Sequence, residues 1–168
     1  MTAHLINSGG RAPGGLVSAA FSVAIALAAG GVGGFATASS VTTWYVGLNK
    51  PAFNPPNFLF APVWTVLYVL MALAAWRIWR APRAASGRGP ALTLYAVQLA
   101  LNLAWSLIFF GLRRPDLALA EVALLLAAVI ATAALFWRVD RPAGLMLIPY
   151  AAWTAFAALL NFEIWRLN

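Results

Sequence analysis

Five long apolar runs constrain the fold of this chain more than any other feature of its sequence. They cover about residues 16–38, 60–79, 91–112, 117–137 and 143–165. Each is close to the roughly 20 residues that an α-helix needs to cross a bilayer. Of the 168 residues, 63% are hydrophobic and 9% are charged, whereas soluble domains carry about 25% charged residues. The sequence predicts an all-α integral membrane protein, with a flexible tail over residues 1–15 and one five-helix transmembrane domain over residues 16–168.

The basic residues lie mainly between the apolar runs, and the net charge is +7. This placement favours contact with membrane lipids, and we expect no nucleic-acid partner. One side of the membrane would receive Arg11, Arg77, Arg80, Arg83, Arg88, Arg138 and Arg141, and the other Lys50, Arg113, Arg114 and Arg166. Cytoplasmic segments are enriched in Lys and Arg, so the pattern predicts a cytoplasmic N-terminus if the protein lies in an inner membrane.

The first apolar run permits two interpretations. Arg11 precedes it and the small triplet Ala36-Thr37-Ala38 ends it, which is also the pattern of a cleaved signal peptide. Signal peptides have a shorter apolar core of about 7–15 residues, so we favour a retained helix, and cleavage stays open. Gly30 and Gly34 have the GxxxG spacing that permits close helix contact.

Prolines dominate the segment between the first two runs, at Pro51, Pro55, Pro56 and Pro62. Proline removes a backbone donor and disfavours helix at the preceding residue, so residues 44–57 should form a stiff loop. The loop also carries Trp44 and Tyr45, which a solvated linker would normally lack. We therefore predict that it caps a pocket between helices 1 and 2. Pro149, inside the last run, should kink that helix.

The third run has two distinct faces. One face carries a stripe at spacings of three and four: Tyr95, Gln98, Asn102, Trp105 and Phe109. The nearly opposite face carries Ala96, Ala100 and Ala104. Amide side chains inside a span seek partners or a cavity, and small residues allow close helix packing. We expect a pocket face and a packing face, the latter suited to a homodimer.

Two other runs carry aromatic stripes at similar spacing. The second has Trp64, Tyr68 and Met71, and the fifth has Tyr150, Trp153, Ala157, Leu160 and Ile164. Stripes from three helices would line one apolar cavity. The alternative is ordinary packing, together with an interfacial belt of Trp79, Trp137 and Trp165.

Residues for metal, nucleophilic or acid–base chemistry are scarce. The sequence has no cysteine, and its single histidine, His4, lies in the tail. Glu121 lies near the start of the fourth run without a paired carboxylate, and Ser106 and Thr65 lack a basic residue nearby in the sequence. We therefore predict no metal site, no catalytic residue and no required cofactor.

Four separated blocks, in order, resemble the TspO/MBR family, also called tryptophan-rich sensory or translocator proteins. They are WYxxLNKPxxxPP (44–56), PVWTxLYxLM (62–71), YxxQLxLNxxW (95–105) followed by FF, and PYxxWxxFAxxLNFEIWRLN (149–168). The resemblance implies five transmembrane helices, a dimer, and binding of porphyrins such as protoporphyrin IX and of isoquinoline-type compounds. It also implies a bacterial rather than mitochondrial member. Phe162 stands where a sterol-binding member has tyrosine, so weak sterol binding at most is expected.

Carried over by position, the resemblance places most of the ligand pocket on residues that the stripes also select. We expect the pocket to be lined by Trp44, Tyr45, Trp64, Tyr68, Gln98, Asn102, Trp105, Trp153, Ala157 and Leu160. The favoured function is tetrapyrrole binding for transport, sensing or regulation. The alternatives are a light- and oxygen-dependent porphyrin-degrading enzyme and a membrane scaffold that acts through dimer or partner contacts.

Overall fold

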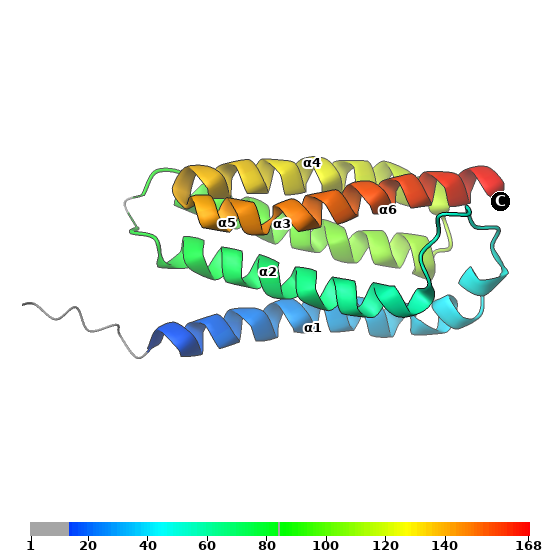
Figure 1. Cartoon of the computed structure of the whole chain (residues 1–168), viewed down its shortest axis with the longest axis horizontal. Coiled ribbons are helices and arrows are strands. Elements are labelled where there is room, and N and C mark those ends of the chain that lie inside the picture. The colour runs from blue at the N-terminus through cyan, green and yellow to red at the C-terminus, as the bar shows by residue number, and fades with distance from the viewer. Residues whose placement is uncertain (1–13, 84) are drawn as a thin grey trace, which may run out of the picture.

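A bundle of long helices makes up the computed structural model, which describes residues 14–83 and 85–168. Its long helices are α1 (Gly14–Thr42), α2 (Phe60–Arg80), α3 (Arg88–Ser106), α4 (Pro115–Val139) and α6 (Ile148–Leu167). Within the described residues, five helical segments are long and apolar enough to cross a membrane. They run alongside one another, with the C-terminus at the end opposite the start of α1 (Figure 1). The predicted all-α membrane fold is confirmed.

The fifth span is interrupted close to the predicted kink at Pro149. The short α5 (Arg141–Met146) is followed by Leu147, and α6 begins with Pro149 in its first turn, where a missing N–H leaves no bond unmade. Asp140 caps α5 by accepting a hydrogen bond from the Ala143 backbone N–H at 3.0 Å. Its carboxylate also pairs with Arg77 of α2 at 3.0 Å. These contacts tie the fifth span to α2 at one end of the bundle.

The core is centred on α4 and on the inner faces of α2, α3, α5 and α6. Met71, Ile78, Val129, Phe136 and Tyr150 are all fully buried. By contrast, α1 is peripheral and presents bare apolar side chains, with Leu16 84% exposed and Phe35 89% exposed. Apolar side chains exposed in this way suit contact with lipid.

Hydrogen bonds and one close approach join α1 to α2 over only part of their length. The Trp76 indole N–H donates to the Ser18 hydroxyl oxygen at 3.0 Å, and the Ser22 hydroxyl donates to the Ala72 carbonyl at 3.0 Å. At Gly30 a Cβ atom would lie 2.4 Å from the Tyr68 ring. Real Cβ atoms do not approach a ring so closely, so a side chain at position 30 would require the Tyr68 ring or α1 to move.

The proline-rich segment is a loop with short turns, as predicted. It contains two 3₁₀ turns, η1 (Tyr45–Gly47) and η2 (Asn57–Leu59), and no α-helix. The Tyr45 hydroxyl donates to Asn54 Oδ1 at 3.0 Å, and burial raises the pKa of Tyr45, which keeps this donor protonated. The loop is also bonded to the C-terminal residue: the Asn49 N–H donates to Asn168 Oδ1, and Asn168 Nδ2 donates to the Asn49 carbonyl, both at 3.0 Å.

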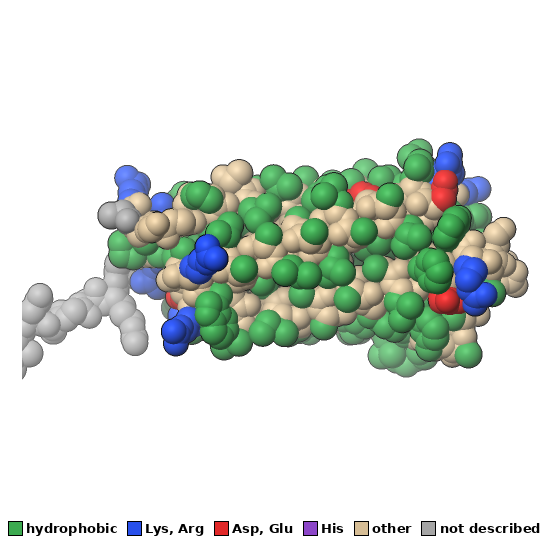
Figure 2. Space-filling view, turned by 90° about the horizontal axis from the view of Figure 1, so that it is seen from above, with side chains coloured by type: hydrophobic (Ala, Val, Ile, Leu, Met, Phe, Trp, Pro, Cys, Tyr) green, Lys and Arg blue, Asp and Glu red, His purple; other side chains and the backbone are tan. Residues whose placement is uncertain are grey.

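Charged side chains gather at the two ends of the bundle. Figure 2 shows Lys, Arg, Asp and Glu mainly at both ends, separated by a surface of hydrophobic side chains and backbone. At the loop end, Arg114 pairs with Asp116 and Arg166 with Glu163. This distribution fits a helix bundle whose middle lies in hydrocarbon. The direction of the chain across the membrane stays a prediction.

Candidate ligand-binding site

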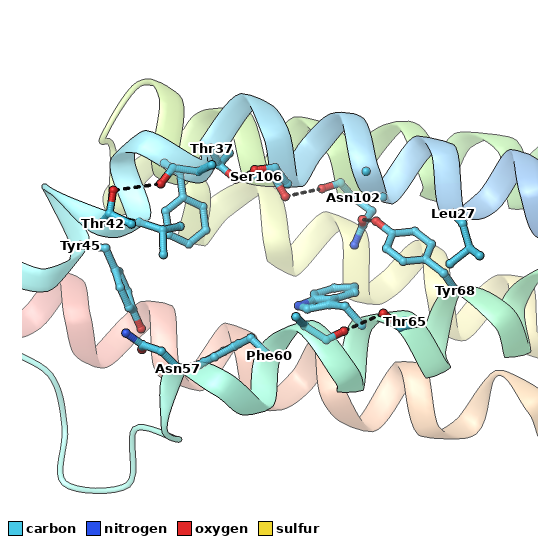
Figure 3. A pocket seen from close by; sticks show the side chains of 18 residues that line it. Leu27, Thr37, Thr42, Tyr45, Asn57, Phe60, Thr65, Tyr68, Asn102 and Ser106 are labelled. Carbon is cyan, nitrogen blue, oxygen red and sulfur yellow. Dashed lines mark hydrogen bonds between the residues drawn. The ribbon is translucent and has the colours of Figure 1, made fainter.

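A large cavity lies between α1, α2 and α3. Its volume is about 630 Å³, within the roughly 300–1,000 Å³ of typical ligand pockets. We call it the main cavity (Figure 3). It is lined by Leu27, Gly30, Gly31, Gly34, Thr37, Ala38, Val41, Thr42, Tyr45, Asn57, Phe60, Ala61, Trp64, Thr65, Tyr68, Asn102, Ser106 and Phe110. None of these residues is charged, so the main cavity suits a predominantly apolar ligand.

A second, much smaller hollow adjoins the main cavity, and we call it the aromatic pocket. Its volume is about 50 Å³, enough for a few waters but far below an ordinary ligand pocket. It is lined by Tyr45, Phe60, Trp64, Trp105, Phe109, Phe110, Trp153, Phe156, Ala157, Leu160, Asn161 and Ile164. Tyr45, Phe60, Trp64 and Phe110 border both hollows and therefore form the wall between them.

Aromatic contacts fill the space around the aromatic pocket. Trp105 stacks on Phe109 with ring centroids 5.4 Å apart, and Phe109 meets Phe110 edge-on at 4.8 Å. Trp153 meets Phe60 at 6.0 Å. The first two contacts depend on η3 (Leu107–Gly111), a single π-helical turn that extends α3. A π turn holds an extra residue, and here neighbouring Phe109 and Phe110 both contact the Tyr45 ring.

The structure distributes the predicted pocket residues over three places. Tyr68 and Asn102 line the main cavity; Tyr45 and Trp64 line both hollows; and Trp105, Trp153, Ala157 and Leu160 line the aromatic pocket but not the main cavity. Trp44 packs edge-on against Phe109 at 5.6 Å and lines neither hollow. Trp64, Trp105 and Trp153, one from each predicted stripe, all line the aromatic pocket, but this pocket is too small in this structure to hold a tetrapyrrole.

Gln98 lies in the protein core and lines neither hollow. Its side-chain amide N–H donates weakly to the Met71 sulfur at 3.9 Å. The predicted polar stripe on α3 therefore reaches the main cavity only through Asn102. On the other face of α3, Ala96 and Ala100 are exposed and Ala104 is half-buried. A dimer through that face stays a prediction.

The main polar feature of the main cavity is a hydrogen-bonded pair. The Tyr68 hydroxyl donates to Asn102 Oδ1 at 2.6 Å, which fixes the orientation of the amide and leaves Nδ2 as a donor. Nδ2 is buried and has no partner within residues 14–83 and 85–168, and in Figure 3 it points toward the space between α1 and α2. An unpaired buried donor costs about 1–3 kcal/mol, so an acceptor on a ligand would find a ready partner here.

Other unpartnered polar atoms lie outside both hollows. In the described part of the chain they are Gln98 Oε1, the Tyr150 hydroxyl and both carboxylate oxygens of Glu121. The described residues contain no cluster of three or more His, Cys, Asp or Glu side chains that could hold a metal ion. The site as it stands offers binding surface and hydrogen bonds.

Sequence reasoning missed two groups of residues around these hollows. The first group is the α1 wall of the main cavity, which includes Gly31, Gly34 and Thr37. The run of glycines in α1 could have indicated this wall, but it was interpreted only as a site of helix contact. The second is Asn161, a third amide buried within a span, which accepts from the Trp105 indole N–H at 3.1 Å and donates to the Pro115 carbonyl at 2.7 Å. Its position within the 149–168 block was the available signal.

Comparison with known proteins agrees with this architecture. The profile of the TspO/MBR family matches residues 22–166. The tryptophan-rich protein TspO of Chlorobaculum tepidum is 38% identical over 91% of this chain and 97% of its own. The protein of the same name from Archaeoglobus fulgidus is 42% identical over 88% and 94%. The translocator protein of Sus scrofa is 41% identical over 82% and 84%. This chain is a membrane protein that belongs to the TspO/MBR family.

Proposed function

We propose that this protein binds a tetrapyrrole of the protoporphyrin IX type in the main cavity, in the service of porphyrin transport, sensing or regulation. The observation that carries the proposal is a cavity of about 630 Å³ with no charged lining residue, located among membrane-spanning helices. A flat, apolar macrocycle matches such a space. The family resemblance favours the same ligand class, and isoquinoline-type compounds are the second class to test.

The lining supports a division of roles between ring surfaces and one polar anchor. Trp64 and Tyr68 lie on the same α2 face with ring centroids 5.8 Å apart. Aromatic rings provide large apolar contact area for a planar ligand. Asn102 Nδ2 is the donor available to a carbonyl or carboxylate oxygen, since Oδ1 is occupied by Tyr68. Lys50 does not line the main cavity, and its ammonium donates to the Val46 and Leu48 carbonyls.

Titration of the purified protein with protoporphyrin IX in darkness tests this proposal. Binding is followed by quenching of tryptophan fluorescence. We expect Trp64→Ala to weaken binding by roughly tenfold or more, equal to about 1.4 kcal/mol. Trp79→Ala is the control, because Trp79 is 62% exposed and lines neither hollow. Equal affinity of the Trp64→Ala variant and the parent would contradict the placement, and absence of saturable binding by the parent would contradict the proposed function.

The same titration under light separates a binding protein from an enzyme. Trp64 lies in the wall between the two hollows, beside Trp105 and Trp153 of the aromatic pocket. An indole beside a bound pigment is an oxidisable group, which favours degradation as the second candidate function. A new absorbing product that forms only with light, oxygen and the folded protein would identify the tetrapyrrole as a substrate. Unchanged absorbance would leave it as cargo or signal.

A further inference from the structure

The main cavity is open on one side, between α1 and α2. We propose that this opening is a lateral portal to the lipid bilayer, through which an apolar ligand enters from the membrane rather than from water. We call it the side opening and define it by Gly31, Gly34 and Ala38 of α1 and by Ala61 and Thr65 of α2. All five residues line the main cavity and all five are exposed. The identity of the ligand rests on the proposed function; the portal itself does not.

The first argument is the change in α1–α2 contact along the two helices. Trp76 and Ser22 hydrogen-bond across the interface, and Gly30 fits against the Tyr68 ring. Beyond Gly30, two further glycines of α1 face open space. A Cβ atom added at Gly31 or Gly34 would find nothing within 4 Å. The two helices are therefore joined in one half and separated in the other, and the main cavity lies in the separated half.

The second argument is the small size of the side chains along the opening. Gly31, Gly34 and Ala38 follow one another at spacings of three and four, which places them on one face of α1. Ala61 and Thr65 stand one turn apart on α2, and the Thr65 hydroxyl is bonded to the Ala61 carbonyl of its own helix at 2.8 Å. Figure 3 shows no helix crossing the space between α1 and α2 on the side facing the viewer.

The third argument is the depth of the opening in the membrane. Thr65 lies eight residues from the loop end of the membrane-spanning segment Asn57–Arg80, which corresponds to about 12 Å at 1.5 Å per residue. The hydrocarbon core is about 30 Å thick, so the opening faces the acyl chains of the leaflet on the loop side. Exposed apolar side chains stand next to these residues in the two helices, with Val32 60% exposed and Val66 59% exposed.

The route from water through the loop is, by comparison, fastened. Tyr45 and Asn57 line the loop end of the main cavity. The Tyr45 hydroxyl is bonded to Asn54, and Asn49 is bonded to Asn168 in both directions. A ligand that passed through the loop would break these hydrogen bonds. At the side opening no hydrogen bond of the described residues joins α1 to α2, so a ligand that passed there would break none. A macrocycle dissolved in lipid would also keep its apolar surface out of water throughout.

The portal is tested first without any tetrapyrrole. The protein is reconstituted in phosphatidylcholine vesicles in which a fraction of the lipid carries a diazirine in the middle of an acyl chain. After illumination, mass spectrometry locates the cross-links. We expect cross-links on residues inside the main cavity, Tyr68 and Asn102 in particular, in addition to those on the outer surface. Cross-links confined to outward residues such as Val32 and Val66 would overturn the portal.

Gly34→Phe narrows the side opening and supplies the matched variant. The position has no neighbour within 4 Å of an added Cβ and no positive φ, so the side chain fits without backbone strain. Ala131→Phe is the control, because Ala131 is an exposed residue of α4 that lines neither hollow. We expect Gly34→Phe to abolish the internal cross-links and Ala131→Phe to leave them unchanged. Internal cross-links that persist in Gly34→Phe would contradict this assignment of the opening.

The kinetic arm uses protoporphyrin IX loaded into the vesicles beforehand and follows tryptophan quenching after mixing. A gate on the route slows entry and release together, so Gly34→Phe should lower both rate constants by roughly tenfold, about 1.4 kcal/mol in the barrier. If Gly34→Phe left the association rate unchanged, or only made release faster, the side opening would not be the route of entry. If the parent protein does not bind protoporphyrin IX, the proposed function fails, while the cross-linking result still decides the portal.

Discussion

The two hollows of the bundle are bordered by opposite kinds of residues. The aromatic pocket is enclosed by rings from the loop, α2, α3, η3 and α6 and retains only about 50 Å³. The main cavity has glycines, small residues and polar side chains along α1 and retains about 630 Å³. Because protein interiors are closely packed, clustered large side chains fill the space that they share. The free volume of the main cavity lies where α1 has glycine and no neighbour replaces the missing side chain.

The two regions also differ in the contacts that fix their walls in place. The aromatic pocket lies against the core, and its Trp105 is fixed by Asn161, which in turn is bonded to the Pro115 carbonyl of α4. The main cavity is bordered by α1, whose outer face is exposed and whose hydrogen bonds to α2 involve Ser18 and Ser22 at one end. We therefore expect substitutions in the aromatic pocket to act mainly on stability, and substitutions along α1 and at Tyr68 to act mainly on ligand binding.

Trp153→Ala should have the largest effect on stability and a small effect on ligand affinity. Trp153 packs against Phe60 and Phe156 and lines the aromatic pocket but not the main cavity. Truncation of a packed tryptophan costs about 3–5 kcal/mol. Reversible unfolding in mixed micelles measures the loss, and the dark titration measures affinity for protoporphyrin IX. A large loss of affinity with unchanged stability would reverse the assignment of the two hollows.

Gly30→Ala should come second and should affect both properties. The added Cβ atom would lie 2.4 Å from the Tyr68 ring, so the ring or α1 must move, and overpacking of this kind costs about 1–3 kcal/mol. The displaced ring would also loosen the Tyr68–Asn102 pair. Thermal unfolding and the titration are compared with those of Gly31→Ala, which adds the same atom where nothing lies within 4 Å. Equal behaviour of the two variants would refute the close approach.

Tyr68→Phe should have a smaller effect, concentrated on the ligand. It removes the donor that holds Asn102 Oδ1 at 2.6 Å and so frees the amide to rotate. A hydrogen bond of this kind contributes about 0.5–1.5 kcal/mol to stability. We expect weaker binding of ligands that present an acceptor oxygen, and little change for analogues without one. Calorimetric titration with a porphyrin and with its dimethyl ester, both of which carry acceptor oxygens, measures the expected loss of affinity. The same titration with an analogue that lacks acceptor oxygens should show little change. Equal losses of affinity for both kinds of ligand would argue against a role of Tyr68 in orienting the Asn102 amide.

Gly34→Ala should have the smallest effect, and in the opposite direction. Replacing a helical glycine by alanine stabilises a helix by about 0.8–1 kcal/mol, and at Gly34 no atom lies within 4 Å of the new methyl group. We expect a slightly higher unfolding temperature and nearly unchanged ligand affinity. A lower unfolding temperature would show that α1 packs more closely at this position than the main cavity allows.

Much of the fold was predictable because it depends on local sequence patterns. Apolar length predicted five spans, Pro149 predicted the interruption of the last one, and the prolines after Pro51 predicted a loop without α-helix. The stripe on α3 was also correctly placed on one inward side, since helical spacing alone decides which residues share a face. In the structure, the residues of this inward side are distributed over the main cavity, the core and the aromatic pocket. Their spacing in the sequence does not predict which of them lies in which place.

Sequence alone therefore determined the membrane-spanning class, the number of helices, the family and which residues of α2, α3 and α6 face inward, since length, periodicity and motif blocks are properties of the chain itself. Only the tertiary structure decided that Gln98 contacts Met71 instead of a ligand space, that three tryptophans share a hollow of about 50 Å³, and that the large cavity lies along the glycines of α1. The physical reason is that a cavity is the volume left between helices. That volume depends on how far apart the helices are held, which is set by distant contacts such as those of Trp76 with Ser18 and of Gly30 with Tyr68.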